Sequence, residues 1–167
     1  TRIALGPLVA RVGLVPDDQL LAQLLSLERL APGRVIAGLG TGDRKSAPEN
    51  AAYGIPYEPA DERRLRLRSI AARLKEAGIP VWVGGGATAT TELAAELGVA
   101  VNLWEAEPAA LAGLAAHMEV TWAGPVPAEP AQAARWLAEV RDAGATWAVC
   151  AWPASLETLA EAADFGR

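Results

Sequence analysis

Cysteine, histidine and methionine are nearly absent from this chain. Its 167 residues include one cysteine, Cys150, one histidine, His117, and one methionine. A single cysteine cannot close an intrachain disulfide, so a disulfide-stapled fold is excluded. No histidine, cysteine or carboxylate residues have the spacing of a metal site, and we expect no bound metal. His117 is assigned a structural role at a helix end, and Cys150 that of a small buried hydrophobic residue.

Long apolar runs and an excess of positive charge are also missing. No stretch of about 18 apolar residues occurs, so no spanning helix is expected. The chain has 15 Lys and Arg against 20 Asp and Glu, a formal charge of −5, which makes nucleic acid a poor partner. The first residues lack the pattern of a signal peptide. We therefore expect a cytoplasmic protein that binds neither nucleic acid nor membrane.

Short apolar stretches alternate with longer amphipathic ones along the chain. The strand-like stretches are residues 3–9, 34–39, 80–83, 99–103, 119–123 and 146–151. Leucine and alanine at helical spacing predict helices between most of them, and a polar loop spans residues 43–59. Strands that alternate with helices predict an α/β protein with a parallel sheet, in one domain of residues 1–167. Periodicity alone does not separate an open sheet from a closed barrel.

Two glycine-rich turns follow the second and third predicted strands. They are Gly40-Thr41-Gly42 and Gly84-Gly85-Gly86-Ala87-Thr88. Glycine lets backbone amides approach a ligand, and the N-terminus of a following helix favours phosphate. One such turn is equally well explained as a tight connection that binds nothing, but two at neighbouring strand ends favour a phosphate-bearing ligand. Neither turn has the Gly-x-Gly-x-x-Gly or P-loop spacing, which argues against dinucleotide and nucleoside-triphosphate sites.

Tryptophan is the abundant aromatic residue, with six copies against one phenylalanine and two tyrosines. Trp104 and Trp152 fall near predicted strand ends, where an indole stacks on a flat heterocycle or fills the core. Asn102 interrupts an apolar strand and needs a polar partner, which inside a barrel can be a cofactor ring. The tryptophans that we expect in the core are Trp82, Trp136 and Trp147.

Residues 24–42 read Leu-Leu-Ser-Leu-Glu-Arg-Leu-Ala-Pro-Gly-Arg-Val-Ile-Ala-Gly-Leu-Gly-Thr-Gly. This segment resembles the helix–strand signature of the luciferase-like monooxygenase family. The family's continuation, an acidic residue, a Gly-Ile-Pro turn and an arginine, has counterparts in Glu49, residues 53–56 and Arg63. Residues 80–85 are similar to a later strand of the family, and residues 2–6 to the strand before the helix. The resemblance extends to the strand that begins at Val99 and fades beyond it.

The resemblance implies a TIM-type (β/α)8 barrel that binds FMN or the deazaflavin F420 at the strand C-termini. The turn after Val83 would then take the cofactor phosphate, and Gly40-Thr41-Gly42 would approach the ring or the substrate. A complete barrel has eight strands and about 250 residues, whereas only about six βα units are found here. We expect the first two strands to be missing, residues 3–8 to form the third, and the barrel to be incomplete at its N-terminus.

We interpret the chain as a flavin- or F420-dependent oxidoreductase or monooxygenase that acts on a small organic substrate. Two alternatives stay open: a non-catalytic barrel that binds a flavin or another phosphate ligand, and an incomplete barrel that needs a partner chain. Formation of a homo-oligomer is also left open, and no residue is assigned a catalytic role. Arg63 or Arg64 is a further candidate for phosphate. The expected cofactor-binding residues are Gly40, Thr41, Gly42, Gly84, Gly85, Gly86, Ala87, Thr88, Asn102 and Trp104.

Overall fold

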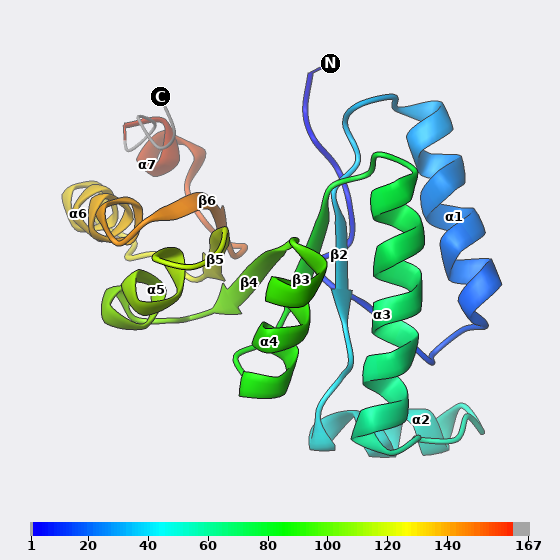
Figure 1. Cartoon of the computed structure of the whole chain (residues 1–167). Coiled ribbons are helices and arrows are strands. Elements are labelled where there is room, and N and C mark those ends of the chain that lie inside the picture. The colour runs from blue at the N-terminus through cyan, green and yellow to red at the C-terminus, as the bar shows by residue number, and fades with distance from the viewer. Residues whose placement is uncertain (1, 162–167) are drawn as a thin grey trace. The chain divides into compact units, whose positions relative to one another are not determined.

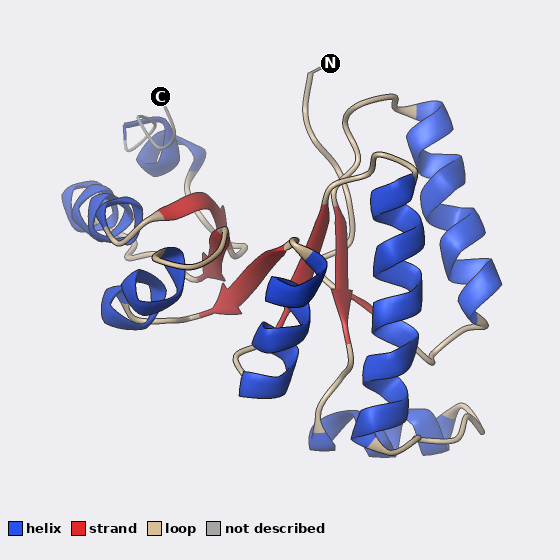
Figure 2. Cartoon of the chain, viewed as in Figure 1, coloured by secondary structure: helices blue, strands red, loops and turns tan. Residues whose placement is uncertain are grey.

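The computed structural model describes residues 2–161, and the chain divides into two compact units, residues 1–99 and residues 100–167 (Figure 1). In both units strands alternate with helices along the chain (Figure 2). The strands within each unit are parallel. The predicted α/β class is therefore confirmed.

The described part of the first unit has three parallel strands in the order β1 (Ala10–Arg11), β2 (Ala37–Gly40) and β3 (Val81–Gly84). Its helices are α1 (Asp17–Leu30), the short 3-10 helix η1 (Arg44–Ser46), α2 (Ala47–Ala52), α3 (Ala60–Glu76) and α4 (Thr88–Leu97). Figure 1 shows α1 and α3 side by side. Their apolar faces supply much of the core of this unit, through the buried residues Leu20, Leu21, Leu24, Leu67, Ile70 and Leu74.

The described part of the second unit has three parallel strands in the order β4 (Ala100–Trp104), β5 (Val120–Gly124) and β6 (Ala145–Cys150). Its helices are α5 (Pro108–Ala115), α6 (Pro130–Asp142) and α7 (Leu156–Glu161). Trp122 of β5 is buried at its centre, donates from Nε1 to the Ala106 carbonyl at 3.1 Å and meets the ring of Trp136 edge-on at 6.2 Å. An indole with its N–H satisfied is a stable core residue.

The first strand differs from the sequence-based expectation. Residues 3–9 do not form a regular strand, and only Leu5 bridges to Val35 before β1 begins at Ala10. Pro7 explains the interruption, because proline has no N–H to donate to a strand ladder. The other predicted strands coincide with β2 to β6 to within a few residues. The segment 43–59, predicted as a loop, contains η1 and α2, which are too short to show a helical period in the sequence.

The tryptophans divide differently from the prediction. Trp82 is buried and Trp136 is half-buried, as expected for core residues. Trp147 is 46% exposed, so its assignment to the core is wrong: the apolar run around it does not make both faces of β6 buried. Trp104 and Trp152 are exposed. Among the described residues, no helix has the length and apolar character needed to cross a bilayer.

Candidate functional site

A pocket of about 870 Å³ lies in the first unit, at the carboxyl ends of β1, β2 and β3. Ligand sites of parallel α/β folds lie at this end of the strands, and the volume is in the range of small-molecule sites. Three segments of the chain line it: residues 9–20, residues 40–49 and residues 84–90. The lining residues are Val9, Ala10, Arg11, Leu14, Val15, Leu20, Gly40, Thr41, Gly42, Asp43, Ser46, Glu49, Gly84, Gly85, Gly86, Ala87 and Thr90.

The last residues of the three strands form one row. Arg11 is the register partner of Gly40, and Gly40 is the register partner of Gly84. A Cβ atom on Gly40 would come within 2.6 Å of Val9 Cγ2, and one on Gly84 within 2.7 Å of Val9 Cγ1. These two glycines therefore make room for the side chain of Val9, which lines the pocket above them. The peptide bond between Leu8 and Val9 is cis.

The N-terminus of α4 forms the glycine-rich side of the pocket. Ala87 is the N-cap residue and has no side-chain oxygen to bind the first amides of the helix. Gly85 has a φ of +143°, which only glycine adopts without strain. Thr90, one turn into α4, is buried and lines the pocket, whereas Thr88 is exposed and lies outside the lining. Residues 84–87 and Thr90 line this end of the pocket, and the first turn of α4 contains no acidic residue.

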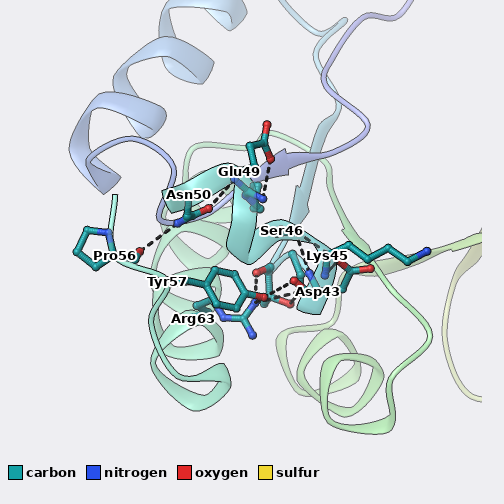
Figure 3. A network of polar contacts seen from close by, with 11 residues as sticks. Asp43, Lys45, Ser46, Glu49, Asn50, Pro56, Tyr57 and Arg63 are labelled. Carbon is teal, nitrogen blue, oxygen red and sulfur yellow. Dashed lines mark hydrogen bonds and ion pairs between the residues drawn. The ribbon is translucent and has the colours of Figure 1, made fainter. Parts of the chain in front are cut away.

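Charged side chains line another part of the pocket. Arg11 donates from Nη2 to Asn50 Oδ1 at 2.7 Å and pairs through Nη1 with Glu49 at 2.9 Å. Asn50 is buried and donates from Nδ2 to the Pro56 carbonyl at 3.0 Å, so this contact connects β1 to α2 and the loop beyond it (Figure 3). Asp43 and Glu49 outnumber Arg11 among the ionisable lining residues. A carboxylate repels an anionic group beside it, so this part of the pocket suits a phosphate less well than the part lined by residues 84–87.

The ionisable groups with clearly shifted pKa values lie outside the pocket lining. The hydrogen bond from Arg66 lowers the pKa of the Glu58 carboxyl, and Glu58 and Asp17 raise the pKa of Arg66 in return. Burial raises the pKa of the Cys150 thiol in the second unit. Cys150 is half-buried and not buried as the sequence suggested, because the side chains of β6 are only partly covered. A thiol with a raised pKa is a poor nucleophile. Within residues 2–161, no group of three or more His, Cys, Asp or Glu side chains could hold a metal ion.

The structure brings together most of the residues singled out in the sequence. Both glycine-rich turns reach the same pocket, through Gly40, Thr41, Gly42, Gly84, Gly85, Gly86 and Ala87. Asn102 and Trp104 belong to β4 of the second unit. Asn102 is buried and donates from Nδ2 to Thr121 Oγ1 at 2.9 Å, so its amide has a partner within the protein. Trp104 is 61% exposed.

Several lining residues were not singled out. Val9 and Arg11 escaped notice because the first strand was placed too early, so that residues 10 and 11 were not recognised as a strand end. Leu14, Val15 and Leu20 are ordinary apolar residues, and nothing in their spacing distinguishes pocket from core. Glu49 was named in the sequence only through the family resemblance. It lies in the pocket lining because it belongs to α2, a helix that was not predicted.

No family model matches this chain, and no curated protein matches it in sequence. Solved structures do resemble it. Apo-MsnO8 superposes with a TM-score of 0.78 at 16% identity, covering 98% of this chain and 78% of that one. The coenzyme F420-dependent tetrahydromethanopterin reductase from Methanopyrus kandleri gives 0.73 at 12% identity, covering 96% and 80%. An archaeal fructose 1,6-bisphosphate aldolase gives 0.55 at 15% identity, covering 83% and 59%.

These similarities establish the fold class. TIM-barrel-like structures match nearly the whole chain, and the six strands of the described residues are consistent with a partial (β/α)n barrel. The barrel-type α/β fold predicted from the sequence is confirmed. An F420-dependent reductase among the neighbours also agrees, at the level of fold, with the resemblance to the luciferase-like family.

Proposed function

We propose that this protein is an oxidoreductase that binds a phosphorylated flavin or deazaflavin, FMN or F420, in the pocket of the first unit. One observation carries the proposal: two glycine-rich turns line the same pocket, and the second of them leads into α4, whose N-terminus has no side-chain cap. The fold is shared with an F420-dependent reductase, which supports this ligand class over other phosphates.

The phosphate would lie at the α4 side of the pocket. Helix-terminal amides and the helix dipole stabilise an anion there by about 0.3–1 kcal/mol per charge, and by up to about 2 kcal/mol where the site is partly buried. Gly85 and Gly86 have no side chain to obstruct it, and Thr90 adds a hydroxyl within the lining. Thr88, at the first position of α4, would need to turn inward to take part.

The ring would lie against the apolar part of the lining, Val9, Leu14, Val15 and Leu20. Pockets for flat cofactors combine such a wall with a few polar groups that fix orientation. Gly40-Thr41-Gly42 would approach the ring or the substrate. When bound, the reduced cofactor supplies the hydride or activates dioxygen, and the protein's part is to bind and orient it and to exclude water.

Asn102 and Trp104 remain proposed cofactor residues of the second unit. The exposed indole of Trp104 is available for stacking on a heterocycle. The Asn102 amide has a second role in the fold through Thr121. Their participation is tested separately from that of the pocket, by single substitutions and titration.

Titration of the purified protein with oxidised FMN and with oxidised F420, followed by fluorescence, tests binding. We expect saturable binding of at least one of them, and turnover when its reduced form is supplied with an electron acceptor or small organic substrates. Failure to bind either cofactor would refute the proposal.

A second candidate is a binding protein without catalysis. Among the described residues, the pocket lining contains no histidine, cysteine or lysine, and Glu49, one of its two carboxylates, is paired with Arg11. Tight cofactor binding without turnover of any reduced form would favour this candidate over the enzyme.

A further inference from the structure

We infer that Arg63 is the positioning residue of the cofactor pocket: it fixes the turn after β2 from outside without touching the ligand. The inference rests on the proposed function, because the pocket is the one proposed to bind FMN or F420. Arg63 belongs to α3 and is not among the residues that line this pocket. Its side chain contacts the backbone of the turn that follows β2, and Figure 3 shows its guanidinium beside Tyr57 and Asp43.

The guanidinium makes several contacts with the turn and its neighbour. Its Nη1 lies 2.6 Å from the Thr41 carbonyl, 3.0 Å from the Gly42 carbonyl and 2.6 Å from the Tyr57 hydroxyl. The same group lies over the ring of Tyr57, at 4.2 Å from the centroid. The Tyr57 hydroxyl in turn donates to the Asp43 carbonyl. Three successive carbonyls, of residues 41, 42 and 43, are therefore held by one Arg–Tyr pair, which we call the Arg63–Tyr57 clamp.

The turn is confined on its other side as well. Gly42 has a φ of +69°, and a Cβ there would come within 2.6 Å of Arg11 Cδ and 2.9 Å of Ser46 Oγ. Unlike Arg63, the turn residues Thr41, Gly42 and Asp43 line the pocket directly. Without the clamp their carbonyls can turn to water, and a ligand would then have to order the turn when it binds. Ordering a loop on binding weakens affinity.

Packing alone does not explain an arginine at this position. Arg63 Nε is buried and has no hydrogen-bond partner among the described residues. A buried orphan donor is unfavourable, so the Nε atom offsets part of the stability that the other contacts of Arg63 supply. Loss of the guanidinium should therefore affect the turn far more than the stability of the whole protein. A lysine would not replace it, because only the planar guanidinium combines a fork of donors with stacking on an aromatic ring.

The test uses Arg63→Gln and Tyr57→Phe, with Arg64→Gln as the matched control. Arg64 is the next residue of α3. It was the other arginine considered for the phosphate, but it lies outside the lining of the cofactor pocket and lines a separate groove with Asp61 and Glu92. Amide hydrogen exchange of residues 41–46 is measured without ligand, and the dissociation constants of FMN and F420 are measured by fluorescence. For Arg63→Gln we expect exchange of this turn and the dissociation constant each to rise roughly tenfold or more, the loss expected for hydrogen bonds from a charged donor.

Chemical rescue separates positioning from a general structural role. Millimolar guanidinium should restore part of the cofactor affinity of Arg63→Ala, whereas sodium at the same ionic strength should not. The thermal midpoint of Arg63→Gln without ligand should stay close to that of the wild type. Tyr57→Phe keeps the stacking ring but loses the hydroxyl, and its effect on affinity should be smaller and less than additive with that of Arg63→Gln.

The inference is overturned if exchange of residues 41–46 is unchanged in Arg63→Gln, or if Arg64→Gln weakens affinity equally. It is also overturned if the affinity loss is matched by a general fall in stability that guanidinium does not rescue. A wild-type protein that binds neither cofactor refutes the proposed function instead. In that case faster exchange confined to residues 41–46 still supports the clamp, and unchanged exchange refutes it too.

Discussion

Gly40 and Gly84 are register partners across β2 and β3, and the Cβ that each of them lacks would collide with the same side chain, that of Val9. Val9 is 41% exposed and lines the pocket. The two glycines at the strand ends therefore shape the floor of the pocket by admitting Val9, whereas Gly85 and Gly86, further along the second turn, are the residues proposed to face the phosphate. Glycines that make room for a neighbouring side chain and glycines proposed to face a ligand therefore follow one another in this turn, and the sequence alone does not tell them apart.

Gly84→Ala should destabilise the protein, because the new methyl group would lie 2.7 Å from Val9 Cγ1. Overpacking of this kind costs about 1–3 kcal/mol, which urea unfolding would measure. Val9→Ala should remove most of that cost in the double variant, since it deletes the colliding carbon. Gly113→Ala in α5 is the matched control: nothing lies within 4 Å of its Cβ position, and alanine should be neutral or stabilising there. Equal costs with and without Val9 would contradict this account of the glycines.

The alternation of strands and helices was predictable because each buried strand here is a short apolar run bounded by turn residues. β2 (Ala37–Gly40) and β5 (Val120–Gly124) are buried throughout, so their sequences carry a clear signal. The first strand was misplaced because residues 3–9 lack charged side chains and were taken as one strand. Pro7 was the sequence signal against a continuous strand, and the backbone pairing shows the break. α2 has six residues, too few to establish a period, and its Asn50 is hydrogen-bonded to Arg11 of β1, a contact that the local sequence does not reveal.

The candidate site was predictable only in part. Glycine-rich turns at strand ends are local patterns, and parallel strands bring them to one edge, so the pair on β2 and β3 could be anticipated. The partners of Arg11 and Arg63 lie 39 and 22 residues away along the chain, at Asn50 and Thr41. Pairings at such separations are fixed by tertiary packing and leave no spacing signal in a single sequence.

Asn102 and Thr121 should behave as a coupled buried pair. Thr121→Val leaves the Asn102 Nδ2 donor without its partner at 2.9 Å and should cost about 1–3 kcal/mol in urea unfolding. Replacing both residues by valine should cost less than Thr121→Val alone, because no polar group is then left unpaired. The same variants test the proposed cofactor role: if Asn102 binds the cofactor, Asn102→Val weakens affinity while Thr121→Val changes it little. Additive costs would rule out the pairing.

Glu58 should make the stability of the protein sensitive to acid. Its carboxylate accepts hydrogen bonds from Arg66 Nε at 2.6 Å and Nη2 at 2.5 Å, and this lowers its pKa in the folded state. The stabilisation is complete above the ordinary glutamate pKa of about 4.3 and is lost as the pH falls through the lower folded value. Glu58→Gln should therefore reduce the free energy of unfolding at neutral pH and approach the wild type in acid. The exposed Glu62 of α3 serves as the control, and a difference between wild type and Glu58→Gln that is constant with pH would contradict the assignment.

The most direct measurement for the account as a whole compares two substitutions at the N-cap of α4. Ala87 has φ −72° and ψ 133°, the backbone conformation of a capping residue, but no side-chain oxygen. Aspartate or serine at this position should each raise the stability of the ligand-free protein by about 0.5–2 kcal/mol, which shows that the new side chain has reached the helix end. Ala87→Asp should also weaken FMN or F420 binding by roughly tenfold or more, because its carboxylate occupies the place of the phosphate, whereas Ala87→Ser should weaken it much less. An Ala87→Asp protein that is stabilised and yet binds its cofactor with wild-type affinity would contradict a phosphate site at this helix.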